Sequence, residues 1–134
     1  MHISATVTSS PGAHHAQVRT GDHEHALAIA PKPAGGGSAT NGGELLMLAL
    51  ATCYCNDLYR EAARLGLALD GVRVEAEADF DGRGLAARNI RYRASVRSSA
   101  SAEDLARLVR ETDAVAEVHN TLRAGTPVEL DVGA

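Results

Sequence analysis

Aromatic residues are scarce in this chain, which has one Phe, three Tyr and no Trp among 134 residues. Its interior must therefore be built mainly from Ala, Leu and Val. A single domain of this length can bury roughly two-thirds of the surface of its unfolded chain. A core made of such small side chains is thin for that size. We therefore expect one domain over residues 1–134 that buries further surface by forming oligomers.

The sequence shows neither a net positive charge, nor an apolar run of membrane-spanning length, nor the pattern expected of a leader segment. The chain has 13 Lys and Arg against 17 Asp and Glu, a formal net charge of −4, whereas nucleic-acid-binding domains are usually basic. The longest apolar run, residues 45–55, is about half of what a membrane-spanning helix needs. The first residues lack the basic and apolar parts of a secretory signal. We expect a cytoplasmic protein that binds neither nucleic acid nor membrane.

Cysteine is limited to Cys53 and Cys55. On a helix this spacing turns the two side chains by about 200°, so they cannot form a disulfide with each other. Two thiols are also too few for a structural zinc site unless histidines join them. His23 and His25 share one face of a predicted strand, but no third ligand of matching spacing accompanies them. We therefore expect no metal, no cofactor and two reduced thiols.

Alternating polar and apolar residues predict strands, and longer periodic stretches predict helices. The outer face of one predicted strand is acidic and that of the next is basic, as in antiparallel partners. The pattern predicts an α+β fold in which an antiparallel sheet folds against one long central helix. The predicted strands are 3–7, 15–20, 24–30, 72–80, 90–97 and 126–132, and the predicted helices are 41–65 and 101–123, the second interrupted at Asp113.

The long helix has clear start and stop signals. Asn41 can cap its first turn, and Glu44 three residues later can complete a capping box. Gly66 can adopt the left-handed conformation that ends a helix. Because the helix is apolar on nearly every side, we expect the rest of the protein to wrap it.

Cys53, in the middle of this helix, has two interpretations. Cysteine is among the most buried residue types, so it can be a small core residue. Alternatively it is a reactive thiol, which needs a nearby cation or hydrogen-bond donor that favours the thiolate. Arg19 is the best candidate cation, unless it is an ordinary solvated arginine. His119 is either a structural histidine or a general base, and with Cys53 it would allow a hydrolytic reaction.

Two blocks of sequence resemble the OsmC/Ohr family of osmotically inducible and organic-hydroperoxide-resistance proteins. The first is the glycine-rich loop 35–37 followed by the Glu-Leu-Leu and Ala-Leu-Ala-Thr-Cys segments within residues 44–53. The second block covers residues 120–128, and the whole resemblance runs from about Gln17 to Leu130. It implies the OsmC-like fold and an intertwined homodimer with active sites at the subunit interface.

The resemblance also implies roles for single residues. Cys53 matches the cysteine that attacks a hydroperoxide and becomes a sulfenic acid. Arg19 is the match for an arginine of the N-terminal hairpin that assists this cysteine. In the family a second cysteine, near the end of the chain, then forms a disulfide with the first.

This chain departs from the family pattern at three places. Ala116 occupies the position of the resolving cysteine, and Glu117 that of the proline after it. Gly43 stands where an acidic residue holds the arginine, so that role is lost or moves to Glu44. His119 replaces a small polar residue. With Cys55 pointing away, the two-cysteine cycle cannot run within one active site.

The resemblance and these departures together favour a thiol-dependent peroxidase of the oxidative stress response. We expect Cys53 to reduce organic hydroperoxides, with an external thiol as reductant. The alternative is a non-catalytic relative that binds a small apolar ligand at the dimer interface.

Overall fold

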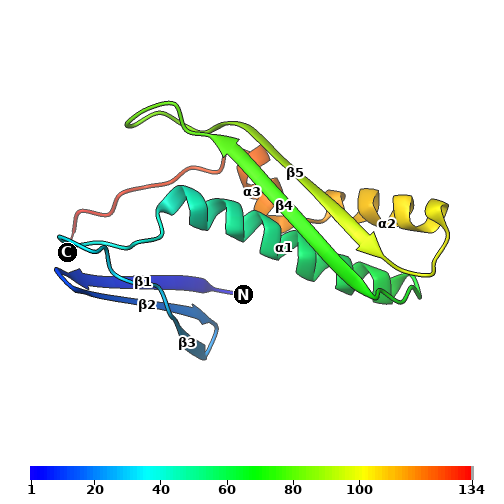
Figure 1. Cartoon of the computed structure of the whole chain (residues 1–134), viewed down its shortest axis with the longest axis horizontal. Helices are drawn as coiled ribbons and strands as arrows, with labels where there is room; N and C mark the ends of the chain where they lie inside the picture. The colour runs from blue at the N-terminus through cyan, green and yellow to red at the C-terminus, as the bar shows by residue number, and fades with distance from the viewer. Residues whose placement is uncertain (134) are drawn as a thin grey trace. The chain divides into compact units, whose positions relative to one another are not determined.

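A computed structural model describes residues 1–133 of the chain, which divides into two compact units, Met1–Leu45 and the part from Leu46 onward. It contains antiparallel strands and one long helix, so the predicted α+β class is confirmed (Figure 1). The strands form two separate sheets rather than the single sheet expected. The assignment of residues 1–134 to one domain stays a prediction.

The first unit is a three-stranded antiparallel sheet in the order β1-β2-β3. Its strands are β1 (Ile3–Ser10), β2 (Ala13–Thr20) and β3 (His23–Leu27). The last strand is shorter than the predicted 24–30, because the chain leaves the ladder after Leu27 pairs with Ala16. It continues into a loop closed by a bridge between Pro31 and Ser38.

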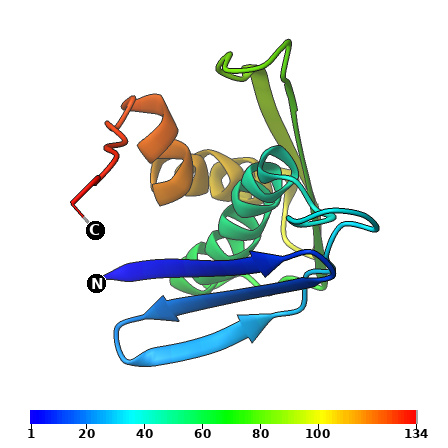
Figure 2. The same ribbon diagram turned by 90° about the vertical axis from the view of Figure 1, so that its left-hand side faces the viewer.

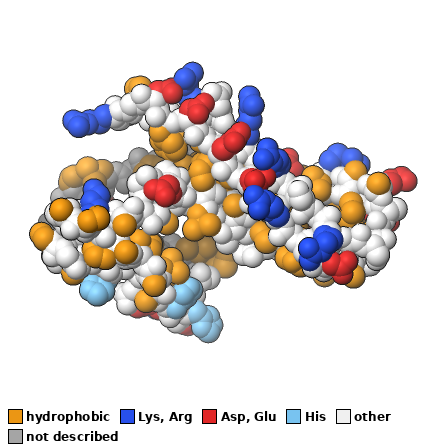
Figure 3. Space-filling view, viewed as in Figure 1, with side chains coloured by type: hydrophobic (Ala, Val, Ile, Leu, Met, Phe, Trp, Pro, Cys, Tyr) orange, Lys and Arg blue, Asp and Glu red, His pale blue; other side chains and the backbone are white. Residues whose placement is uncertain are grey.

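This sheet has almost no core of its own. Ala16 is the only buried residue within residues 1–45. Large apolar side chains stay exposed on it, with Ile3 62% and Val7 61% accessible. Orange side chains are accordingly prominent on the surface of this unit in Figure 3. Apolar surface of this kind is typical of a region that contacts another molecule.

The long helix α1 (Gly42–Arg64) begins and ends as its sequence predicts. The Asn41 N–H donates to Glu44 Oε1 at 3.2 Å, and the Glu44 N–H donates to Asn41 Oδ1 at 2.8 Å, which is a complete capping box. Gly66 follows with a φ of 71°, a conformation that glycine adopts without strain.

In the single chain, α1 is buried along one stripe rather than on all sides. Leu48 and Tyr59 lie off this stripe and are 59% and 47% exposed. The stripe is therefore the face on which the rest of the second unit packs. It consists of Leu50, Tyr54, Asp57, Leu58, Glu61 and Ala62.

The rest of the second unit contains β4 (Gly71–Asp79), β5 (Arg88–Arg97), α2 (Ala102–Ala114) and α3 (Glu117–Arg123). β4 and β5 are antiparallel, and Glu75 faces Arg93 across the ladder, which confirms the predicted acidic and basic partners. Figure 2 shows this hairpin as one layer beside the helices. Tyr54, Leu58, Ala62, Leu108 and Ala116 form the core between them.

The predicted strand 126–132 is wrong. Residues 126–133 form no strand in the described chain, and Val128 is 99% exposed. Pro127 has no N–H to donate to a ladder, and no neighbouring strand pairs with this segment. Among the helices of residues 1–133, none has the length and hydropathy that a membrane crossing requires.

Candidate functional site

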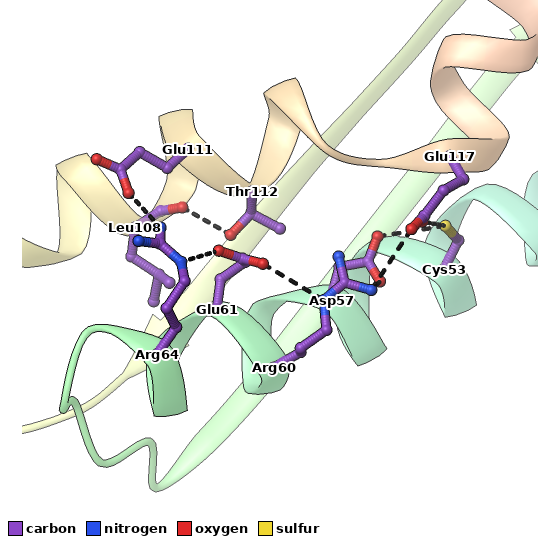
Figure 4. Close-up of polar contacts among 9 residues, drawn as sticks. All are labelled: Cys53, Asp57, Arg60, Glu61, Arg64, Leu108, Glu111, Thr112 and Glu117. Carbon is purple, nitrogen blue, oxygen red and sulfur yellow. Dashed lines mark hydrogen bonds and ion pairs between the residues drawn. The ribbon is translucent and has the colours of Figure 1, made fainter.

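Two carboxyl groups surround the Cys53 thiol (Figure 4). Its Sγ donates a hydrogen bond to Asp57 Oδ2 at 3.5 Å and lies 4.0 Å from Glu117 Oε2. Asp57 is four residues further along α1 and therefore on the same face of the helix. Glu117 is the first residue of α3, so the last helical region approaches the thiol from the other side. Acidic neighbours rather than a cation define the immediate surroundings of the thiol in this unit.

Arg60 is the cation that the two carboxylates share. Its Nη1 lies 3.0 Å from Asp57 Oδ1 and 3.5 Å from Glu117 Oε1. Asp57 is buried, only 5% exposed, whereas Glu117 is largely open to solvent. One guanidinium thus faces two acidic groups, which leaves a surplus of negative charge beside the thiol.

These surroundings hold the proton at the site. Burial raises the pKa of the Cys53 thiol, and the charge of Asp57 raises it further, against a backbone hydrogen bond from Val118 that lowers it. Burial also raises the pKa of Asp57, with Glu117 adding to the rise and Arg60 opposing it. The thiol therefore keeps its proton more tightly than an ordinary cysteine, next to a carboxylate positioned to accept it.

Arg19 and Glu44 belong to residues 1–45, and their roles towards Cys53 stay predictions. Arg19 Nε donates to the carbonyl oxygen of Gly21 at 2.8 Å, and its Nη2 lies 3.9 Å from Asp22. Glu44 closes the capping box of α1. Within its own unit, then, each side chain already has a local structural partner.

His119 is buried in an aromatic cluster. It is 3% exposed, its ring lies 4.3 Å from that of Tyr92 and 5.8 Å from that of Tyr54, and neither ring nitrogen has a hydrogen-bond partner. Burial lowers the pKa of His119, which favours the neutral ring. Within residues 1–133 no hydrogen bond connects it to Cys53, so its role as a general base stays a prediction.

A small cavity opens beside this histidine. Its volume is about 250 Å³, and its lining is Leu50, Ile90, Tyr92, His119, Leu122 and Arg123. Arg123 is held by Asp113, with 2.6 Å between Nη2 and Oδ1. The cavity thus combines apolar walls with a polar ring that lacks a partner, and its size suits a small molecule rather than a dinucleotide cofactor.

The ligand atoms of Cys53, Asp57 and Glu117 lie within 4.8 Å of one another. They are the one set of this kind among the described residues. Arg60 already contacts both carboxylates and supplies the positive charge that a metal would bring. His23 and His25 are exposed on β3 and belong to no such set.

Asp57, Arg60 and Glu117 are the site residues that the sequence reasoning missed. Asp57 could have been found, because its spacing of four from Cys53 places both on one helical face. Arg60 follows one turn later. Glu117 had only an indirect signal, since it adjoins Ala116 at the position of the missing cysteine, and its contact with Cys53 depends on how α3 packs.

Residues 35–131 match the sequence profile of a family described as OsmC-like protein. The search of curated proteins found no match. Solved structures of organic hydroperoxide resistance proteins share the fold at low identity. The one from Legionella pneumophila is 18% identical, with a TM-score of 0.60, over 92% of this chain and 90% of that one.

Two further structures were solved with small molecules bound. The organic hydroperoxide resistance protein of Elizabethkingia anophelis, with thiocyanate bound, is 19% identical with a TM-score of 0.61, over 92% of this chain and 89% of that one. A putative organic hydroperoxide resistance protein from Vibrio cholerae has captopril in one of its active sites. It is 23% identical with a TM-score of 0.55, over 92% of this chain and 85% of that one. At these identities the likeness establishes the fold.

Proposed function

We propose that this chain, which belongs to the OsmC-like protein family, reduces organic hydroperoxides through Cys53 and is regenerated by an external small thiol. The observation that carries the proposal is the position of Cys53. Cys53 is half-buried on the long helix, beside the start of α3, and its thiol donates a hydrogen bond to the Asp57 carboxylate at 3.5 Å. The organic hydroperoxide resistance proteins among its structural neighbours support the same substrate class.

The proposed reaction begins with attack by the Cys53 sulfur on the terminal oxygen of the hydroperoxide. A sulfur–oxygen bond forms, the O–O bond breaks, and the alkoxide leaves and takes up a proton to become an alcohol. Sulfur is oxidised to the sulfenic acid and the peroxide is reduced. A first molecule of external thiol displaces water to form a mixed disulfide. A second one releases Cys53 and leaves as the oxidised disulfide.

The external thiol follows from the cysteine content. Cys53 and Cys55 are both free, and they are the only cysteines of the chain. Ala116, at the position where the family's second cysteine is expected, is fully buried in the core. Nothing within the chain can then capture the sulfenic acid, so the resolving thiol comes from outside.

We further propose that the working form is a cytoplasmic homodimer acting in the oxidative stress response. The exposed Ile3, Val7 and Leu27 of the first unit support this assembly, since an uncovered apolar sheet face is typical of a subunit interface. In such a dimer Arg19 would approach Cys53 and favour the thiolate, with Glu44 orienting it. A folded monomer at sub-micromolar concentration, measured by mass photometry, would contradict this assembly.

The proposed activity is tested by the consumption of cumene hydroperoxide in the presence of dithiothreitol. We expect turnover by the wild-type protein and by Cys55→Ser, and none by Cys53→Ser. One equivalent of peroxide should yield a species trapped by a dimedone reagent, and excess peroxide should over-oxidise Cys53 to the sulfinic acid. If no adduct forms at any peroxide level while Cys53→Ser remains folded, the peroxidase proposal fails.

The cavity beside His119 favours a second candidate function, the binding of a small apolar ligand. The ring nitrogens of His119 have no hydrogen-bond partner although the residue is only 3% exposed. An unpaired buried polar group costs free energy of folding. The apolar body of a small phenol suits the lining residues Leu50 and Leu122. We expect phenol to shift the methyl signals of Leu50 and Leu122, which line the cavity, in NMR spectra with a saturable isotherm. Loss of that shift in His119→Leu, with Cys53→Ser unaffected, would support the cavity as the binding site.

A further inference from the structure

We propose that Asp57 is a catalytic residue that takes the proton of the Cys53 thiol and delivers it to the alcohol leaving group. Glu117 and Arg60 act as positioning residues for this transfer. The inference rests on the proposed peroxidase function and deepens it, because it assigns the source and the path of the proton that the reaction needs.

The geometry places one carboxylate oxygen where this transfer requires it. Asp57 Oδ2 accepts the hydrogen bond from Cys53 Sγ at 3.5 Å, while its other oxygen, Oδ1, is held by Arg60 Nη1 at 3.0 Å. Because Arg60 holds one oxygen of this carboxyl group, the other oxygen stays oriented towards the thiol. Because Asp57 is only 5% exposed, bulk water has little access to compete for the proton.

The charges around Asp57 favour a shared proton. Within the unit that begins at Leu46, the groups that act on Asp57 are Cys53 and Arg60 from α1 and Glu117 from α3. Arg60 also pairs with Glu61, with 3.3 Å between Arg60 Nε and Glu61 Oε1, so its charge is shared further. Two carboxylates and a thiol thus face one guanidinium. Such a site stabilises a proton on the group of acids more than full ionisation does.

The proton balance of the peroxide step follows from this arrangement. As the sulfur attacks, the thiol proton moves to Asp57 Oδ2. The S–O bond forms, the O–O bond breaks, and the proton passes from Asp57 to the departing alkoxide, which leaves as the alcohol. Asp57 ends the step as it began, a carboxylate, and Cys53 carries the sulfenic acid. The general base and the general acid are therefore one side chain, used in turn.

A purely electrostatic role for the carboxylates predicts a different effect of replacing Asp57 than the proton relay does. If Asp57 only opposes the thiolate by its charge, removing that charge lowers the pKa of Cys53 and speeds every reaction of the thiolate. If Asp57 relays a proton, its removal slows those reactions whose leaving group needs one. Alkylation by iodoacetamide releases iodide, which needs no proton, whereas cumene hydroperoxide releases an alkoxide, which does.

The test compares these two second-order rate constants for Cys53 in the full-length protein, by stopped-flow mixing and mass spectrometry. In Asp57→Asn we expect alkylation to accelerate and the hydroperoxide reaction to slow by about 100-fold, the usual scale of acid–base catalysis. Glu117→Gln should shift both rate constants in these same directions by less, since Asp57 remains. If Asp57→Asn does not fold, Glu117→Gln serves as the test variant in its place. The matched control is Glu111→Gln, which removes a carboxylate of α2 that is bound to Arg64 and Arg107. It should leave both rate constants unchanged.

The outcomes separate the two proposals. If Asp57→Asn accelerates both reactions, or slows both equally, the relay is overturned while the peroxidase function stands. If the wild-type protein forms no sulfenic acid with hydroperoxide, the peroxidase function fails and the relay with it. Opposite changes in the two rate constants support both.

Discussion

Asp57 and Glu61 lie one turn apart on α1 and are almost equally buried, at 5% and 8% exposed, yet the protein shifts their pKa values in opposite directions. Hydrogen bonds from Arg64, at 2.6 Å, and from Arg60 hold the pKa of Glu61 below its usual value. Burial raises the pKa of Asp57, and Glu117 adds to the rise. Burial and counter-charges together therefore decide the direction of the shift. Two arginines contact Glu61 and outweigh the effect of its burial, while Asp57 shares one arginine and the effect of burial prevails.

The two buried carboxyl groups consequently serve different purposes. Glu61, Arg64 and Glu111 form a paired network that ties α1 to α2 (Figure 4). Asp57 and Glu117 leave negative charge unpaired beside Cys53. An arrangement that is poor for stability but holds a proton next to a thiol is what the proposed reaction at Cys53 requires.

The largest effect is expected from a large-to-small change in the buried stripe of α1 that carries both carboxylates. Leu58 lies between them on α1 and is fully buried. Leu58→Ala should lower the free energy of unfolding by about 2–5 kcal/mol, because the deletion leaves a cavity in the core. Urea denaturation measures this. Leu85→Ala, at a site 61% exposed, should cost far less, and equal losses would show that the stripe is not the core of this unit.

The pH dependence of stability should separate Asp57 from Glu61 by sign. The folded pKa of Asp57 is raised above its usual 3.8, so the folded state holds an extra proton and stability falls as pH rises through that window. The slope is at most about 1.4 kcal/mol per pH unit for one proton. The folded pKa of Glu61 is lowered below 4.5, so its contribution is present above 4.5 and is lost as pH falls through the folded pKa.

Chemical denaturation between pH 3 and 8 tests this pair with two isosteric variants. Relative to wild type, Asp57→Asn should gain stability near neutrality, and Glu61→Gln should lose it. Both differences should shrink in acid, where the wild-type carboxyl groups become protonated. Changes of the same sign near neutrality would refute the contrast between the two residues.

A smaller effect should follow from removing the shared cation. Arg60→Gln takes from Asp57 its one arginine but leaves Glu61 with Arg64. We expect the pKa of Asp57 to rise further and that of Glu61 to change less. Carbon-13 NMR titration of the side-chain carboxyl groups measures both. Equal shifts would mean that Arg60 serves the two carboxylates alike.

The smallest effect is expected at Glu75, which has two arginine partners like Glu61 but lies half-exposed on the β4–β5 hairpin. Arg73 and Arg93 contact it at 2.8 Å and 2.7 Å. Solvent screens such surface pairs, so Glu75→Gln should leave the thermal midpoint unchanged within the reproducibility of calorimetry. A clear loss here would show that pairing matters without burial, and would weaken the argument from Glu61.

Local features of the fold could be predicted from the sequence because they depend on residues close together in the chain. Asn41 and Glu44 formed the expected capping box, and Gly66 the expected stop. The pairing of acidic and basic strand faces was also readable, since alternation defines the face of a strand. The strand expected at 126–132 failed because a strand also needs a partner, and composition does not supply one.

The candidate site divides in the same way. Cys53 stood out from its helical context, and Asp57 was accessible to the same reasoning through its spacing of four. The approach of Glu117, 64 residues away in the chain, was not. Nor was the burial of His119 between Tyr54 and Tyr92, which brings together α1, β5 and α3.

The sequence by itself determined the α+β class, the limits of the long helix and the place of Cys53 within it. These follow from periodicity and capping, which act within a few residues. Only the tertiary structure decided that the thiol lies against two carboxylates sharing one arginine, because the electrostatic field at an atom sums over charges near it in space. The packing of α3 on α1, and not the distance along the chain, decides which charges lie near Cys53.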